Sequence, residues 1–201
     1  MEKAGAVALT FFIAFLVSYF DRITTNYPNT ARFIWRSLYL IGYAAMYALA
    51  SALVLLGLGA LIDSGSLTLE GSGVGNIWIQ AIFIGLSAKA ALNINLATFN
   101  GVPIGVQTLI YPLERFLLSS LEGEAWNQRQ EFITRLVVKY TRLDEVKQTA
   151  KSNIPPQIAN DEDRKDAYLR DVESKQTVPD LLDFIIREID ARTFNRIFPA
   201  S

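Results

Sequence analysis

A run of twenty-six uncharged residues, 37–62, constrains this chain more than any other feature. It reads SLYLIGYAAMYALASALVLLGLGALI, in which only three tyrosines and two serines carry polar side chains. The hydrocarbon core of a membrane is about 30 Å thick, and roughly 20 apolar residues of α-helix cross it. We therefore expect a transmembrane helix over 37–62.

Two further apolar runs predict two more spans. Residues 4–20 contain no charged residue, and residues 77–99 contain only Lys89. The first run lies near the N-terminus, but the residues at its end, LVSYF, offer no A-x-A-like cleavage site. We therefore expect a retained helix rather than a signal peptide. The sequence thus predicts a transmembrane domain over 1–100 with spans at about 4–20, 37–62 and 77–99.

The charges predict how these spans are oriented. The first loop carries Arg22, Arg32 and Arg36, whereas residues 63–76 contain two acids and no Lys or Arg. Basic loops stay on the cytoplasmic side of a membrane. We therefore expect a multi-pass protein of the plasma (inner) membrane, with its N-terminus outside and its C-terminal domain in the cytoplasm.

Polar side chains inside the spans are expected to hold the helices together. Tyr43, Tyr47 and Ser51 recur every four residues on the middle span, and Asn95 lies on the third. In lipid, helices associate through small residues and hydrogen bonds, because lipid tails are as apolar as the helices. These four residues are our candidates for polar packing within the membrane.

The third predicted span carries a second polar face. At 100° per residue, Gly85, Lys89, Asn93 and Asn100 fall on one side of a helix. A buried ammonium usually finds a carboxylate or water, and the other two spans contain no Asp or Glu. These four residues are therefore candidates to line an aqueous, anion-permeable pore. The alternative is that Lys89 extends toward the cytosolic interface and meets Tyr43 and Tyr47.

Three spans are too few to enclose a pore in a monomer. A ring of identical subunits would supply the missing walls without any further sequence. The pore interpretation therefore predicts a homo-oligomer embedded in membrane lipid.

The second half of the chain is charged and predicts a soluble helical domain. Residues 101–201 hold fourteen of the nineteen Lys and Arg and sixteen of the twenty Asp and Glu. We expect a connecting or interfacial helix over 101–123 and a cytosolic helical domain over 124–201. Its expected helices cover 124–151 and 161–174, with a third beginning at Thr177. The predicted fold class is therefore all-α.

A basic stripe on the first of these helices is the candidate ligand site. Arg135, Lys139 and Arg142 would share one face, with Trp126 nearby for stacking. Such a face could bind an anionic nucleotide or a short oligonucleotide. The alternative is a solvated face that pairs with the acidic helix 161–174 of its own or a neighbouring subunit.

The composition argues against an enzyme. The chain has no cysteine and no histidine, so the commonest general base, thiol nucleophiles and zinc-thiolate sites are excluded. No phosphate-binding glycine loop or HExxH helix occurs in the sequence. We expect no catalytic residues, no bound metal and no cofactor.

The layout resembles the small membrane effectors of bacterial anti-phage systems. The resemblance rests on Lys89, Asn93 and the Arg135/Lys139/Arg142 stripe in a chain without catalytic motifs. It implies a nucleotide-gated pore that depolarises the membrane, and a partner enzyme that makes the signal. The competing interpretation is a non-conducting membrane anchor or scaffold that recruits a cytosolic partner through residues 124–201.

Overall fold

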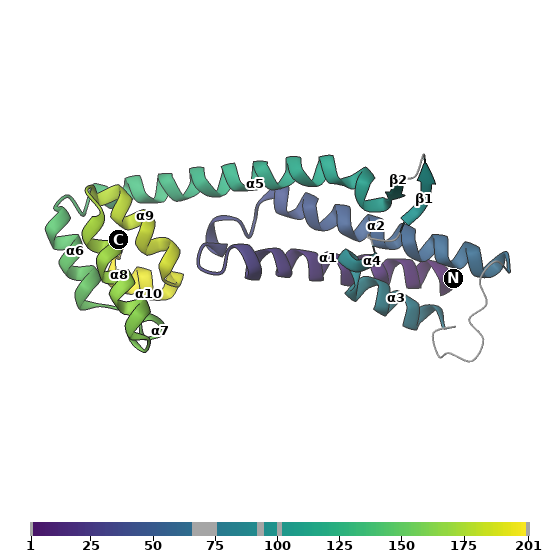
Figure 1. The fold of residues 1–201 in the computed structure, drawn as a ribbon, viewed down its shortest axis with the longest axis horizontal. Helices are drawn as coiled ribbons and strands as arrows, with labels where there is room; N and C mark the ends of the chain where they lie inside the picture. The colour runs from purple at the N-terminus through teal and green to yellow at the C-terminus, as the bar shows by residue number, and fades with distance from the viewer. Residues whose placement is uncertain (1, 66–75, 92–94, 100–101, 200–201) are drawn as a thin grey trace. The chain divides into compact units, whose positions relative to one another are not determined.

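The computed structural model describes residues 2–65, 76–91, 95–99 and 102–199. The described part of the chain is mainly helical, as predicted, and it also contains one short hairpin (Figure 1). It divides into two compact units. The N-terminal unit comprises Met1–Asn26 and Arg36–Leu121, and the C-terminal unit comprises Tyr27–Trp35 and Glu122–Ser201.

The N-terminal unit is built on two long helices, α1 (Glu2–Asn26) and α2 (Leu38–Asp63). The Ser37 side chain caps α2 by accepting a hydrogen bond from the Tyr39 N–H. Four small residues at four-residue spacing give α1 its buried face, namely Ala6, Thr10, Ala14 and Ser18. A face of small side chains lets helix backbones approach closely.

The third predicted span is not one helix. Helix α3 (Ile77–Leu86) ends at Ser87, whose backbone N–H and hydroxyl both donate to the Phe83 carbonyl. A four-residue helix follows, α4 (Ala88–Ala91), and then strand β1 (Asn95–Phe99). Strand β1 pairs in antiparallel register with β2 (Val102–Gly105). At about 1.5 Å per residue, α3 is roughly 15 Å long, about half of what a membrane span requires.

Two helices in the described part of the chain, α1 and α2, are long and apolar enough to cross a membrane. The prediction of three such helices is therefore wrong. Helix α3 is apolar but short.

Helix α5 (Val106–Val137) supplies residues to both units. It continues through Pro112 and unites the expected connecting helix with the first half of the helix expected over 124–151. The second half of that expected helix is separate, because the chain leaves α5 after Val137 and resumes at α6 (Leu143–Ser152). The prediction of one unbroken helix over 124–151 is wrong.

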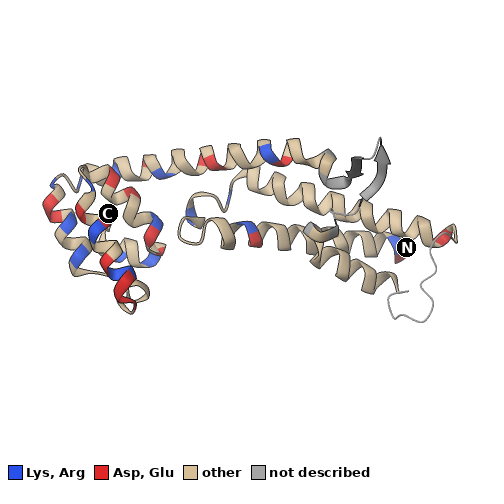
Figure 2. Cartoon of the chain, in the orientation of Figure 1, with Lys and Arg blue, Asp and Glu red and all other residues tan. Residues whose placement is uncertain are grey.

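The C-terminal unit is a bundle of short helices, each with a polar or proline start. These are α7 (Pro156–Ala159), α8 (Glu162–Ser174), α9 (Val178–Glu188) and α10 (Ala191–Ile197). Asp161, Thr177 and Asp190 cap α8, α9 and α10 through their side chains. The predicted helices over 161–174 and from Thr177 are confirmed. Charged side chains are dense on these helices and sparse on α1, α2 and α3 (Figure 2).

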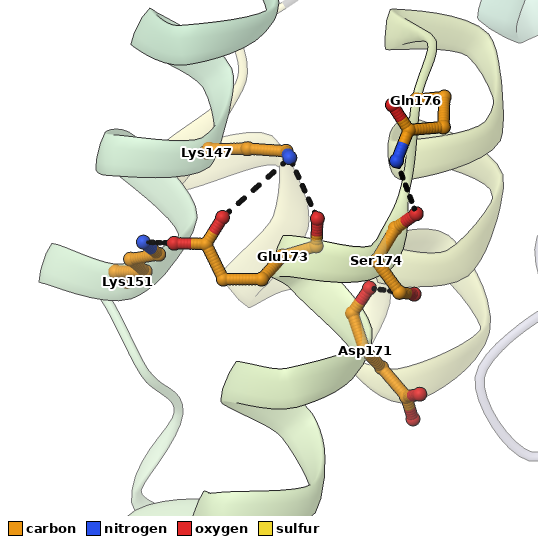
Figure 3. Close-up of polar contacts among 6 residues, drawn as sticks. All are labelled: Lys147, Lys151, Asp171, Glu173, Ser174 and Gln176. Carbon is orange, nitrogen blue, oxygen red and sulfur yellow. Dashed lines mark hydrogen bonds and ion pairs between the residues drawn. The ribbon is translucent and has the colours of Figure 1, made fainter.

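One acid joins α6 to the end of α8 (Figure 3). The Lys147 amine donates to the Glu173 backbone carbonyl at 2.7 Å and lies 3.5 Å from its carboxylate. Lys151 pairs with the other carboxylate oxygen of Glu173. Lys147 thus satisfies a carbonyl at the C-terminal end of α8, where a positive charge is favourable.

Candidate functional site

The loop between α1 and α2 packs within the C-terminal unit. Residues Tyr27–Trp35 belong to that unit, although the two helices they join belong to the other. The Asn29 side-chain amide donates a hydrogen bond to the Arg187 carbonyl at 2.7 Å. Phe33, in the 3₁₀ turn η1 (Ala31–Phe33), is buried with its ring centre 5.7 Å from that of Phe132. The loop is therefore held by a hydrogen bond and by ring packing.

Arg32 is the central contact of this loop. Its guanidinium carbon lies 4.7, 4.5 and 5.2 Å from the ring centres of Phe33, Phe132 and Phe194. One terminal nitrogen donates to the Asn195 side-chain oxygen at 3.1 Å, and Nε is buried with no hydrogen-bond partner among the described residues. Burial lowers the pKa of Arg32, yet a guanidinium stays charged in proteins. The ring faces therefore supply much of its stabilisation.

The rings around Arg32 belong to a longer series, which we call the aromatic ladder: Phe33, Phe132, Phe194, Phe198 and Tyr140. Successive ring centres are 5.7, 5.9, 5.4 and 5.5 Å apart. Spacings of 4.5–7 Å are those at which aromatic pairs attract one another. The ladder therefore links the α1–α2 loop, α5, α10 and the turn after α5 by continuous contact.

The far end of the ladder reaches a residue of the predicted ligand site. The Lys139 amine donates to the Pro199 carbonyl at 3.0 Å, and the Tyr140 hydroxyl donates to the same oxygen at 3.4 Å. The Lys139 amine also lies 5.7 Å from the centre of the Tyr140 ring. A ligand that displaced Lys139 would therefore disturb the contacts of Tyr140, the last ring of the ladder.

A charge network fixes α9 against α5 beside the ladder. Asp183, on α9, lies 2.5 Å from Nε of Arg129 on α5 and also pairs with Arg187. Both Arg129 and Asp183 are largely shielded from solvent, so removing either partner would leave a poorly solvated charge. Arg187 is also the residue whose carbonyl holds Asn29. The network and the loop therefore share a residue.

The three cations of the predicted ligand site do not belong to one helix. Arg135 pairs with Glu131 on α5, Lys139 lies in the turn after α5, and Arg142 is the N-cap residue of α6 and pairs with Glu145 at 2.8 Å. Trp126 is exposed on α5. Helix α5 ends at Val137, between Arg135 and the other two cations. Each of the three cations has a carboxylate or carbonyl partner within the chain.

The predicted pore residues are only partly described. Gly85 is buried against α1, where an added Cβ would lie 2.9 Å from Ile13 and 3.3 Å from the Thr10 carbonyl. Lys89 lies on α4 and Asn95 on β1, and their side chains lie outside the described part of the chain. Asn93 and Asn100 lie outside it altogether. Gly85 thus serves the packing of α3 on α1.

The predicted polar residues of α2 are buried, and one of them, Tyr47, has a partner that the sequence did not reveal, whereas the Ser51 hydroxyl has no hydrogen-bond partner among the described residues. Tyr43, Tyr47 and Ser51 are all buried on α2. The Tyr47 hydroxyl donates to the Glu114 carboxylate at 2.7 Å, and Glu114 belongs to the first half of α5. The signal was Glu114, an acid within the apolar stretch 104–121.

Sequence reasoning also missed the aromatic ladder. Its rings are scattered over the first loop, α5 and the C-terminus, so no local pattern in the sequence brings them together. No protein-family model, curated protein or solved structure matches the chain.

Proposed function

We propose that this chain is an integral membrane protein whose cytosolic C-terminal unit controls its spans through the α1–α2 loop. The proposal rests on the position of the Arg32 guanidinium among the rings of Phe33, Phe132 and Phe194. The bound loop is covalently continuous with α1 and α2, so a change in the C-terminal unit acts on both helices. The aromatic ladder supplies a route for that change from the turn that holds Lys139.

The surface of the N-terminal unit supports a membrane setting. Large apolar side chains are exposed on each of its main helices, including Phe12 on α1, Leu53 on α2, Phe83 on α3 and Phe116 on α5. In water such a surface would drive aggregation, whereas lipid tails would solvate it.

The loop contacts support a topology. Since Tyr27–Trp35 pack on the C-terminal unit, both lie on the same side of the membrane, and the arginines of the loop assign that side to the cytosol. Because α2 ends on the outer side of the membrane in this topology, the chain must cross back to the cytosolic side between Ser64 and Leu121. Helix α3 is too short to cross alone, so the proposal places the first half of α5 within the returning segment.

We propose that this coupling controls ion conduction by a homo-oligomer. Lys89 is the candidate for the residue that makes the pore prefer anions. The nucleotide signal, the partner enzyme and the role in anti-phage defence stay predictions from layout. The second candidate function is a non-conducting anchor or scaffold. It is favoured by the internal partners of Arg135, Lys139 and Arg142, which leave these cations engaged without any ligand.

Ion flux through liposomes containing the purified full-length chain separates the two functions. We expect chloride and potassium flux from the wild-type chain, and a several-fold change in flux with Arg32→Ala because the loop is uncoupled. Arg170→Ala is the matched control, since Arg170 is exposed on α8 and lies outside both the ladder and the predicted ligand site. Absence of flux, together with a monomeric particle in detergent, would support the anchor.

A further inference from the structure

Among the side chains that the structure describes, one hydrogen bond joins the first half of α5 to α2. The Tyr47 hydroxyl donates to Glu114 at 2.7 Å, while the Tyr47 ring packs against Tyr43 with ring centres 4.9 Å apart. Around this hydrogen bond the contact is apolar. Ile110, Leu117 and Leu118 of α5 pack against a cluster on α2 made of Tyr43, Met46, Tyr47 and Ala50.

In lipid, the apolar contacts and the hydrogen bond differ in how strongly they favour the docking of α5 on α2. An apolar side chain that leaves α2 meets lipid tails of the same polarity, so the apolar packing gives little preference for the docked position. A carboxyl and a hydroxyl that separate lose hydrogen bonds that the hydrocarbon cannot replace. The Tyr47–Glu114 hydrogen bond therefore has the largest influence on whether α5 is docked.

The Tyr47–Glu114 contact can respond to the C-terminal unit because one continuous helix, α5, connects them. Helix α5 continues without interruption from Glu114 to Val137, and its second half bears Phe132 of the aromatic ladder and the buried residues Ile133 and Leu136. A displacement of the ladder is therefore a displacement of α5. The same helix carries the carboxylate that Tyr47 holds.

We propose that the Tyr47–Glu114 hydrogen bond is a releasable clasp, which holds α5 on α2 in the resting state and opens when the C-terminal unit changes. Its role in gating rests on the proposed conducting function. The clasp itself, as the contact that sets the docked population of α5, rests only on the proposed membrane setting of α2 and α5.

Cysteine cross-linking measures the clasp directly, because the natural chain contains no cysteine. Gly42 of α2 faces Leu117 of α5, and an added Cβ at Gly42 would lie 3.3 Å from Leu117 Cδ2. The full-length double variant Gly42→Cys with Leu117→Cys is placed in liposomes, and its rate of disulfide formation reports how often α5 is docked.

We expect Tyr47→Phe to lower that rate about threefold to tenfold, as loss of one hydrogen bond within a membrane would. Glu114→Ala should lower it by a similar factor. Combining the two should lower it no further, because both remove the same interaction. Glu114→Gln keeps an acceptor oxygen and should stay close to the parent. The control pair, Ala14→Cys with Ala48→Cys, joins α1 to α2 within one buried cluster and should be unaffected throughout.

Unchanged cross-linking in Tyr47→Phe and Glu114→Ala would overturn the clasp, whatever the flux. A lower rate in the control pair as well would mean general unfolding and would also count against it. Ion flux is measured on the same variants without the cysteines. If cross-linking falls as expected and no variant conducts, the clasp stands and the proposed conducting function fails.

Discussion

The two units of this chain place the same residue type in opposite environments. Phe83 and Phe116, in the N-terminal unit, are each 60% exposed, whereas Phe194 and Phe198, in the C-terminal unit, are fully buried. Polar side chains show the reverse arrangement. Thr10 and Ser51 are fully buried in the N-terminal unit, whereas the helices of the C-terminal bundle are rich in charged residues (Figure 2).

On the proposed membrane setting, different forces stabilise the two units. Burial of apolar surface against water accounts for the C-terminal unit, at roughly 25 cal/mol per Å². The N-terminal unit leaves much of its apolar surface uncovered and joins its helices by small residues and hydrogen bonds. One example is the Thr10 hydroxyl, which lies 3.0 Å from the Ala6 carbonyl and 3.2 Å from the Ala81 carbonyl. The second pattern is typical of helices in lipid.

The largest expected effect is a cavity in the C-terminal unit. Phe194→Ala removes a fully buried ring that contacts Phe132, Phe198 and Arg32. We expect a loss of about 3–5 kcal/mol in the free energy of unfolding of this unit. Denaturant titration of the full-length chain in detergent, followed by circular dichroism, measures it. Phe83→Ala is the matched control, and a loss as large at that exposed position would break the contrast between the units.

The next effect is a charge on the outer face of α2. Leu53 is 65% exposed near the middle of this helix. If lipid surrounds it, Leu53→Lys should cost about 2.5–3.5 kcal/mol for membrane insertion. Glycosylation tags at either end of α2, scored during translation into microsomes, give the inserted fraction. The control is Val138→Lys, since Val138 is 81% exposed in the C-terminal unit and should tolerate a charge there. Equal insertion of the Leu53→Lys variant and the parent would contradict a lipid-facing α2.

Local patterns predicted the elements whose determinants lie close together in sequence. The uncharged run 37–62 anticipated α2, and Thr177 followed by a valine and a proline anticipated the start of α9. The prediction of a third span failed because apolar composition does not distinguish one long helix from a short helix that ends at Ser87. The prediction of one unbroken helix over 124–151 failed because nothing in the periodicity of this segment marks the break after Val137.

The site was harder to predict because its contacts join distant residues. Arg32 meets Asn195 across 163 positions, and Tyr47 meets Glu114 across 67. Sequence alone identified Tyr47 as a buried polar residue but gave no means of choosing its partner. Arg32 was interpreted as a topology signal, which explains its charge but not the three phenylalanine rings around it.

The smallest effect concerns two helix caps, one in each unit, which differ in their response to pH. The Asp190 carboxylate accepts hydrogen bonds from the backbone N–H groups of Arg192 and Thr193 at 2.9 and 3.1 Å and so caps α10. In the N-terminal unit, the neutral Asn76 amide caps α3 by the same geometry, accepting from the Trp78 N–H at 2.8 Å. Only the first of these caps can titrate.

Hydrogen bonds from Thr193, its hydroxyl first and its backbone N–H second, hold the pKa of Asp190 below its usual range. A carboxyl with a lowered folded-state pKa stabilises above its unfolded value near 3.9, and the contribution is lost as pH falls through the folded value. We expect Asp190→Ala to cost about 1 kcal/mol at neutral pH. Asp190→Asn should keep the cap at neutral pH and lose less stability on acidification than the parent. Thermal unfolding of both variants and the parent at neutral and acid pH measures the difference. An identical acid response in the parent and in Asp190→Asn would show that the carboxylate cap adds no pH dependence to the C-terminal unit.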